Sequence, residues 1–231
     1  MLPKNIGGEM KALISLSGGL DSTTLASYLL SDEFKGVTEL EAVSFYYGSK
    51  HNKYENEAAV KVAKYFRIPL IFIDLSVAFH SFDSALLIND RDIPEGHYQA
   101  ENMRQTVVPA RNMIFTSILF GLAESRKIPY VALGVHAGDH FIYPDCRPEF
   151  ITTIDIAGRA ATDKKVSLLT PFLMFGKDKI ISLGHQMAAP FHLTRTCYKD
   201  QPIACGVCGS CSERKEAFAL NGLTDPIQYE A

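Results

Sequence analysis

The sequence predicts an α/β fold in which a parallel sheet carries helices on both faces. Over the first 75 residues, apolar runs typical of buried strands alternate with segments of helical spacing, and this order argues for parallel strands joined by crossovers. Two adjacent glycines and several hydroxyl residues stand at the first strand-to-helix junction, the kind of place where such sheets bind ligands. With 231 residues, 47% of them hydrophobic, the chain is expected to form one domain over residues 1–231.

The expected elements follow one another along the whole chain. Strands are expected at 11–16, 39–46, 68–73, 129–135 and 166–169, because each is a short apolar or aromatic run. Helices are expected after residue 20, at 50–66, 109–126 and 151–161, and from residue 176, because apolar side chains recur there at helical spacing. Residues 75–108 have an irregular pattern, which predicts either a lid over the site or a surface excursion.

The first strand-to-helix junction, residues 15–24, has the sequence SLSGGLDSTT. Glycines let the backbone turn sharply and approach a ligand, and the following helix offers unpaired N–H groups and the positive end of its dipole. The lysine of common mononucleotide loops is missing, so the hydroxyls and amides of this stretch suit a departing pyrophosphate better. The structural alternative is an ordinary glycine-rich turn capped by Ser17.

Two cations are expected at helix starts. Arg111 and Lys177 fall in the first turns of expected helices, where the helix dipole disfavours positive charge. A nearby anion would explain both positions. A solvated arginine and a plain surface lysine are the alternatives.

A polar cluster, residues 136–149, follows the fourth expected strand, where ligands of a parallel sheet bind. Its carboxylates and its arginine are Asp139, Asp145, Arg147 and Glu149. His136 and His140 would share one face of a helix as metal ligands, but Gly138 weakens that interpretation. Substrate recognition by the Asp145, Arg147 or Glu149 side chain is the preferred interpretation.

Four cysteines near the C-terminus follow the spacing C-x7-C-x2-C-x2-C; they are Cys197, Cys205, Cys208 and Cys211. Tetrahedral zinc takes four thiolates, and C-x2-C turns with glycine supply two at a time. An iron–sulfur cluster accepts the same ligands. Because four thiolates leave no open position for a catalytic water, the prediction is a structural Zn²⁺ in a small C-terminal knuckle at about residues 195–215.

Composition and charge exclude several classes of protein. The net charge of −3 gives no broad basic surface for nucleic acid. No apolar run approaches the roughly 18 residues of a membrane span, and the N-terminus lacks a secretory pattern. We therefore expect a cytoplasmic protein that binds neither nucleic acid nor membrane.

Taken together, the motifs resemble the ATP pyrophosphatase superfamily and, within it, the 7-cyano-7-deazaguanine synthase family. The resemblance rests on SGGLDS at 17–22, on Tyr47-Gly48 with His51, on VPARN at 108–112, on YPDCR at 143–147 and on the cysteine spacing. It spans nearly the whole chain. One departure is Ala110, which stands where the family commonly has glycine.

The resemblance implies an adenine nucleotide alpha hydrolase-like fold and an AMP-forming carbon–nitrogen ligase that takes 7-carboxy-7-deazaguanine, ammonia and two ATP to the nitrile, on the route to queuosine. Asp21 would hold Mg²⁺, and Asp21, Arg111 and Lys177 would be catalytic. ATP would bind along Leu16, Ser17, Gly18, Gly19, Leu20, Asp21, Ser22, Thr23, Thr24, Leu25 and Ala26. The deazaguanine would bind to Tyr47, His51, Asp139, Asp145, Arg147 and Glu149, with Asp145 or Glu149 reading the guanine-like edge. Members of the family are often homodimers.

The nitrogen source and the competing functions follow from features that are missing. The chain begins Met1-Leu2 and not with the cysteine of an N-terminal nucleophile glutaminase, so free ammonia or ammonia from another protein is expected. The alternatives are a tRNA-modifying member of the superfamily, a zinc-binding module without catalysis, and a relative that attaches the deazaguanine to a macromolecule. The charge balance argues against the first of these.

Overall fold

In the computed structural model, which describes residues 10–32, 34 and 37–230, five parallel strands form a sheet in the order β3-β2-β1-β4-β5. The strands are β1 (Met10–Ser15), β2 (Val37–Tyr46), β3 (Leu70–Asp74), β4 (Tyr130–Ala132) and β5 (Ser167–Leu169). The chain builds outward from β1 to β3 and then returns to the other side of β1. The strand order therefore reverses between β1 and β4, which is where open parallel sheets bind ligands. Met1 and Leu2 lie outside the described residues.

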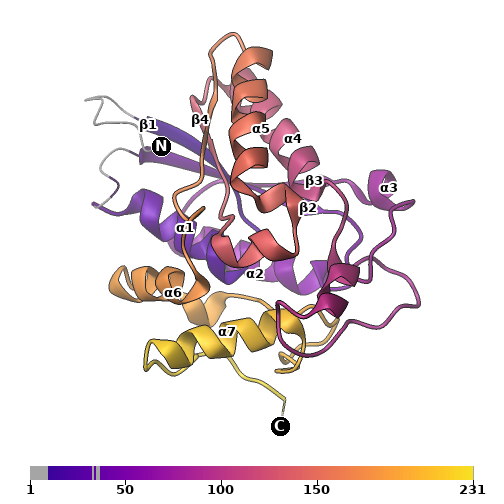
Figure 1. Ribbon diagram of the computed structural model, residues 1–231. Helices are drawn as coiled ribbons and strands as arrows, with labels where there is room; N and C mark the ends of the chain where they lie inside the picture. Colours follow the sequence, from indigo (N-terminus) through magenta and orange to yellow (C-terminus); the bar gives the residue numbers. More distant parts are fainter. Residues whose placement is uncertain (1–9, 33, 35–36, 231) are drawn as a thin grey trace.

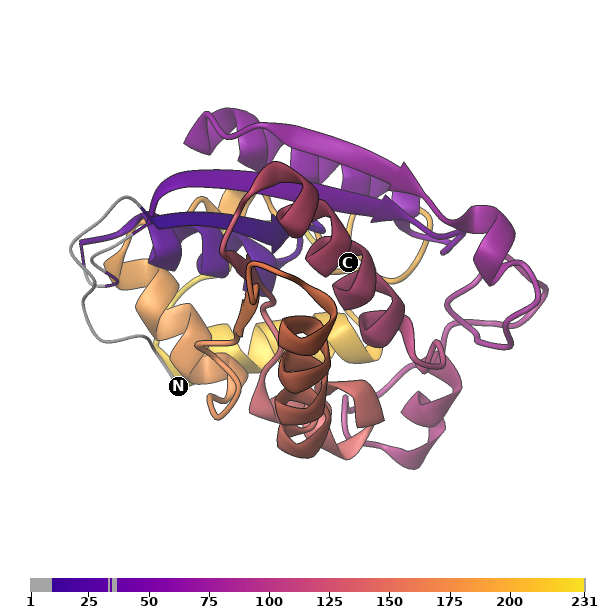
Figure 2. The same ribbon diagram turned by 90° about the horizontal axis from the view of Figure 1, so that it is seen from above.

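Alternate strand residues face two separate cores. On β1, Ile14 packs into one core and Leu13 into the other. The first core is covered by α1 (Leu20–Leu30), α2 (Asn52–Phe66) and α6 (Lys177–Gln186), and the second by α4 (Arg111–Arg126) and α5 (Pro148–Ala161) (Figure 1). From above, the indigo and purple strands lie side by side with their arrows in one direction (Figure 2). The predicted parallel sheet with helices on both faces is confirmed.

Two boundaries differ from the expected ones for physical reasons. The fourth strand ends at Ala132 and not at residue 135, although Leu133 and Val135 stay buried. Its apolar pattern therefore reflects burial beyond the paired segment. The long helix begins at Arg111 because Ala110 adopts a left-handed φ of 53°. Glycine adopts that conformation without steric cost, so this alanine is strained where the resembled family commonly has glycine.

The irregular segment, residues 75–108, is packed against the carboxyl end of the sheet. It contains α3 (Ser76–Phe79) and the 3-10 helix η1 (Glu101–Thr106), and its Leu86 and Met103 side chains are fully buried. Its Tyr98 hydroxyl donates a hydrogen bond of 2.6 Å to Asp139 Oδ1. The segment is therefore not a surface excursion.

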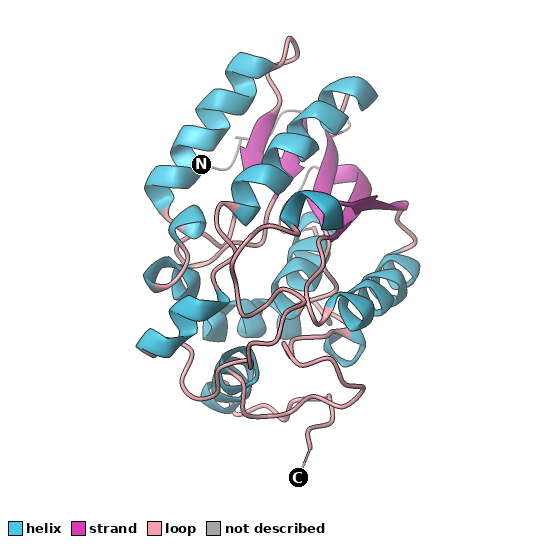
Figure 3. Ribbon diagram, turned by 90° about the vertical axis from the view of Figure 1, so that its right-hand side faces the viewer, coloured by secondary structure: helices cyan, strands magenta, loops and turns pink. Residues whose placement is uncertain are grey.

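The C-terminal part closes the molecule below the sheet. Short 3-10 helices η2 (Ala137–Phe141), η3 (Pro144–Cys146) and η4 (Phe191–Leu193) precede α7 (Gly209–Leu220), which packs against α6 (Figure 1). Coloured by secondary structure, the strands occupy the upper half of the molecule, and loops and short helices gather beneath them (Figure 3).

One stretch, Glu101–Arg126, is long and apolar enough to cross a membrane by length and composition. It is not one continuous helix, because η1 ends at Thr106 and the left-handed Ala110 precedes α4. Within α4, Phe115 and Leu119 are buried in the core that α4 and α5 form with one face of the sheet. The apolar composition of α4 is thus explained by packing.

Candidate active site

A cavity opens where the carboxyl ends of β1 and β4 meet, which is the reversal point of the strand order. We call it the central cavity. Its polar lining includes Ser17, Asp21, Ser22, Tyr47, His51, Glu55, Tyr98, Arg111, His136, Asp139, Lys177, Arg195 and Glu213. These side chains come from segments far apart in the sequence, so the fold and not any single motif assembles them.

The glycine-rich loop, residues 16–19, forms one wall of the central cavity. Gly18 has a φ of 78°, and a Cβ there would lie 2.4 Å from the Ala59 nitrogen of α2, so only glycine fits between the loop and that helix. The Gly19 N–H donates to Ser17 Oγ at 3.1 Å. The N-cap of α1, Gly19, has no side chain to cap the first turn. The N–H groups of that turn and the positive end of the helix dipole are therefore directed at the cavity, as in an oxyanion site.

Beside the loop, Lys177 lies among three carboxylates and a histidine, and we call this group the Lys177 cluster: Asp21, His136, Asp139, Lys177 and Glu213. Lys177 Nζ lies 2.6 Å from Asp21 Oδ2, 3.3 Å from Glu213 Oε2 and 3.1 Å from His136 Nε2. His136 Nε2 lies 3.5 Å from Asp139 Oδ2. The other Asp21 oxygen, Oδ1, is buried and has no hydrogen-bond partner among the described residues. A buried carboxylate oxygen without a partner is costly, so this atom is available to a ligand.

Asp21 and Lys177 keep their charges inside the Lys177 cluster. Burial raises the pKa of Asp21, but the Lys177 ammonium and His136 outweigh it and hold that pKa below its ordinary value. Burial lowers the pKa of Lys177, but Asp21, Glu213 and Asp139 raise it well above its ordinary value. The Asp21–Lys177 pair is therefore ionised at neutral pH.

A second group of lining side chains comes from the start of α2 and of α4. His51 Nε2 lies 3.4 Å from Glu55 Oε2, and Arg111 Nη1 donates to the Tyr47 hydroxyl at 3.4 Å. Burial, reinforced by Arg111 and Arg195, lowers the pKa of His51 to about 3, so the ring is neutral. Burial raises the pKa of Glu55 to about 7, although both arginines act in the opposite direction. Glu55 therefore changes its protonation state near neutral pH.

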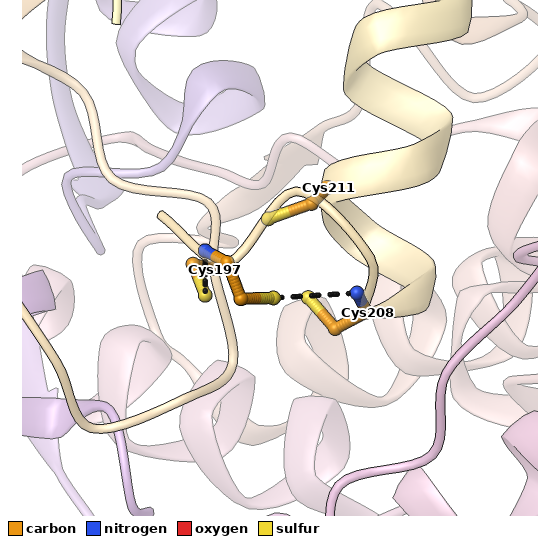
Figure 4. A group of neighbouring side chains, drawn as sticks. Cys197, Cys208 and Cys211 are labelled. Carbon is orange, nitrogen blue, oxygen red and sulfur yellow. Dashed lines mark hydrogen bonds between the residues drawn. The ribbon is translucent and has the colours of Figure 1, made fainter. Parts of the chain in front are cut away.

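The four cysteine side chains converge in a buried group near the start of α7. Their Sγ atoms all lie within 4.8 Å of one another, and among the described residues they are the group that brings three or more ligand atoms of Cys, His, Asp or Glu together. Figure 4 shows Cys197, Cys208 and Cys211 pointing toward one another beside the helix. The Cys205 N–H donates to Cys197 Sγ and the Cys208 N–H to Cys205 Sγ, each at 3.3 Å. N–H donors on sulfur are typical of the surroundings that orient metal-bound thiolates.

Residues 11–222 match the family described as queuosine biosynthesis protein QueC. The chain belongs to this family. It is 44% identical over 224 residues to the 7-cyano-7-deazaguanine synthase of Allorhizobium ampelinum, which covers 96% of this chain and 93% of that protein. It is 41% identical over 220 residues to the enzyme of the same name from Pseudoalteromonas translucida, covering 95% and 99%. Among solved structures, the U34-tRNA thiolase NcsA from Methanococcus maripaludis is similar with a TM-score of 0.49 and 18% identity, over 96% of this chain and 67% of that one. The resemblance predicted from the motifs is confirmed.

This QueC-family chain places the expected ATP-binding stretch partly in the central cavity. Ser17, Gly19, Leu20, Asp21 and Ser22 line it. Leu16, Gly18, Thr23, Thr24, Leu25 and Ala26 are buried behind the wall. The two expected catalytic cations, Arg111 and Lys177, both line the cavity.

The expected substrate residues divide into two sets. Tyr47, His51 and Asp139 line the central cavity. The structure places Asp145, Arg147 and Glu149 elsewhere, outside the lining that the described residues form. Asp145 Oδ2 accepts the Asn112 N–H at 2.7 Å in the first turn of α4, Arg147 Nε donates to the His140 carbonyl at 2.9 Å, and Glu149 is exposed. Asp145 and Glu149 are therefore not among the residues that line the cavity, and their expected contact with a guanine-like edge stays a prediction.

The lining residues that had not been singled out from the sequence include Glu55, Tyr98, Arg195 and Glu213. Proximity to the cysteines in the sequence could have pointed to two of them: Arg195 stands two residues before Cys197, and Glu213 stands two residues after Cys211. Glu55 follows His51 by four residues and so shares its helix face. Tyr98 lies in the irregular segment, where no periodicity predicts its direction.

Proposed function

We propose that this chain is an ATP-dependent carbon–nitrogen ligase that converts 7-carboxy-7-deazaguanine and ammonia to 7-cyano-7-deazaguanine, releasing AMP and pyrophosphate. Membership of the QueC family and the names of its relatives support the substrate. The adenylation chemistry is supported mainly by one observation: the uncapped first turn of α1 and the Asp21–Lys177 pair line the same cavity. Such a site receives an anionic leaving group beside a fixed positive charge.

The residues fit an adenylation sequence. A carboxylate is a poor electrophile, so its oxygen first attacks the α-phosphate of ATP while pyrophosphate leaves toward the glycine-rich loop and the first turn of α1. Ammonia then displaces AMP from the acyl adenylate and gives an amide. A second adenylation of the amide oxygen permits loss of AMP with formation of the nitrile. Lys177 and Arg111 balance the charge on the reacting phosphates, and the rigid loop fixes their alignment.

Asp21 fits the role of a magnesium ligand. Its Oδ1 atom is buried and unpartnered among the described residues, while Oδ2 is held by Lys177. Mg²⁺ takes oxygen ligands from one or two carboxylates together with phosphate oxygens. When bound there, Mg²⁺ would neutralise charge on the departing pyrophosphate.

The cysteine group fits a structural zinc ion. Zn–S bonds of about 2.3 Å place tetrahedral sulfurs about 3.8 Å apart, within the 4.8 Å limit that the four Sγ atoms meet. A four-iron cluster would interpose its own iron and sulfide atoms and hold the sulfurs further apart. We therefore assign Zn²⁺ to Cys197, Cys205, Cys208 and Cys211.

For the cellular setting we infer a cytoplasmic homodimer that uses free ammonia and binds neither nucleic acid nor membrane. The net charge of −3 supports the absence of a nucleic-acid partner. The homodimer rests on the family resemblance.

The test is incubation of the purified chain with ATP, Mg²⁺, ammonium and 7-carboxy-7-deazaguanine, with mass detection of the nitrile and separate assay of the nucleotide products. The expected result is the nitrile together with AMP and pyrophosphate. ADP and orthophosphate as products, or AMP release that depends on tRNA in place of the deazaguanine, would overturn the proposal.

A further inference from the structure

The carboxylates that line the central cavity differ in what they already bind. Asp21 and Glu213 both contact the Lys177 ammonium, and Asp139 accepts the Tyr98 hydroxyl. The Glu55 carboxylate lies 3.4 Å from His51 Nε2 and accepts no hydrogen bond from the described residues; its side chain lines the cavity and is 19% exposed. Among the described residues, Glu55 is therefore the lining carboxylate that neither contacts Lys177 nor accepts a hydrogen bond.

Helix α2 holds Glu55 rigidly beside the glycine-rich loop. A Cβ on Gly18 would lie 2.7 Å from the Glu55 carbonyl oxygen, so the loop rests directly on this turn of α2. Glu55 lies in the first turn of a helix that runs from Asn52 to Phe66, and rigid elements position binding groups more accurately than loops do. The Glu55 side chain therefore lines the central cavity at a fixed position, on the turn of α2 that supports the loop.

The charges around Glu55 differ from those of the Lys177 cluster. Arg111 and Arg195 are the cations that act on Glu55, whereas Lys177 acts on Asp21 and Glu213. One carboxylate next to two guanidinium groups suits a ligand that carries both hydrogen-bond donors and a negative charge. A carboxylated deazaguanine has both, since N1–H and the 2-amino group are adjacent donors and the 7-carboxylate is an anion. Adenine offers a donor next to an acceptor, so a carboxylate matches it only in part.

We propose that Glu55 determines the specificity for the base by accepting hydrogen bonds from N1–H and the 2-amino group of the deazaguanine. This inference rests on the function proposed above and names the residue that reads the substrate. It replaces Asp145 and Glu149, whose side chains lie outside the cavity lining.

The experiment compares two substrates across three proteins: wild type, Glu55→Gln and Glu57→Gln. The substrates are 7-carboxy-7-deazaguanine and its analogue without the 2-amino group. Glu57 is exposed on the same helix and serves as the matched control. We expect wild type and Glu57→Gln to prefer the 2-amino substrate by about 10- to 100-fold in kcat/KM, the usual worth of one bidentate contact to a base edge. Glu55→Gln should lose most of this preference, through a higher KM for the deazaguanine with the KM for ATP unchanged.

Each outcome separates this inference from the proposed function. A wild-type protein that makes no nitrile from 7-carboxy-7-deazaguanine refutes the function. A wild-type protein that makes it, while Glu55→Gln keeps the full preference for the 2-amino group, refutes the inference alone. A raised KM for ATP instead of the deazaguanine would assign Glu55 to the adenine and also overturn it. If Glu55→Gln is inactive, equilibrium binding of the two deazaguanines is measured for this variant and for Glu55→Asp. Glu55→Asp retains the carboxylate and should retain part of the preference. Equal preference in wild type and Glu55→Gln again refutes the inference.

Discussion

Replacing Gly18 by alanine should destabilise the protein far more than the same change at a glycine with open space around it. At Gly18, φ is 78°, and the new Cβ would lie 2.4 Å from the Ala59 nitrogen and 2.7 Å from the Ala58 carbonyl carbon. Both atoms belong to the backbone of α2 and have no rotamer with which to move away. The left-handed conformation costs alanine about 1–2 kcal/mol, and forced contact in a packed interior costs about 1–3 kcal/mol more.

The matched control is Gly222→Ala. Gly222 has a similar φ of 64°, but a Cβ there meets nothing within 4 Å. The control variant should therefore lose only the conformational part, and Gly18→Ala should lose about 1–3 kcal/mol more in the free energy of unfolding. Urea denaturation at neutral pH measures both values, and nucleotide binding measured alongside should weaken only in Gly18→Ala. Free energies of unfolding that agree within about 0.5 kcal/mol would refute the contact between the loop and α2.

Three further predictions concern the site. Asp21→Asn should lower kcat for AMP release by roughly 10²- to 10³-fold, because the proposed Mg²⁺ ligand is weakened and Lys177 loses its closest anion. Asp32→Asn, at an exposed turn residue just beyond the C-terminus of α1, should leave kcat unchanged. Equal turnover of the two variants would remove Asp21 from the mechanism. Removal of the bound metal with a chelator should weaken ATP binding, because Arg195, two residues before Cys197, donates its backbone N–H to the Gly18 carbonyl at 2.9 Å. Added zinc should restore ATP binding. Metal-free protein that binds ATP normally would contradict this coupling. Burial raises the pKa of Glu55 from 4.5 to about 7, so the Glu55 carboxyl holds its proton more tightly in the folded state than in the unfolded state. The free energy of unfolding should therefore fall by up to about 3 kcal/mol as the pH rises from 4.5 to about 7. Urea denaturation at several pH values should show this fall in wild type and not in Glu55→Gln, and parallel profiles would disprove it.

The sequence predicted those parts of the structure that short segments determine by themselves. Strands and helices followed from apolar spacing, since burial of one face is a local property of the pattern. The junction that carries Asp21 was predictable because glycines, hydroxyls and a following helix are contiguous there. The cysteines were predictable for the same reason, because the C-x2-C turns fix sulfur positions over a few residues.

Residues that depend on the path of the chain were less predictable. Asp145 and Glu149 follow β4 in a dense polar stretch. His136, Asp139, Tyr143 and Cys146 of this stretch line the cavity, but Asp145 and Glu149 do not. There Asp145 serves the start of α4 by accepting the Asn112 N–H, a role that polarity alone does not distinguish from substrate binding. Conversely, Lys177 meets Asp21 across 156 residues of sequence, and only the position of α6 beside α1 brings them together.

The C-terminal segment contributes to the central cavity and is more than a remote knuckle. The loop between the first two cysteines holds Arg195, because its Nη2 donates to the Lys199 carbonyl at 2.8 Å and its Nη1 to the Pro202 carbonyl at 3.2 Å. The Arg195 Nε atom is buried and has no partner among the described residues, while its backbone N–H holds the glycine-rich loop. After the last cysteine, the second turn of α7 brings Glu213 to Lys177. A metal held by the four cysteines would therefore also fix a cation and a carboxylate of the cavity, which couples the proposed metal site to the proposed active site.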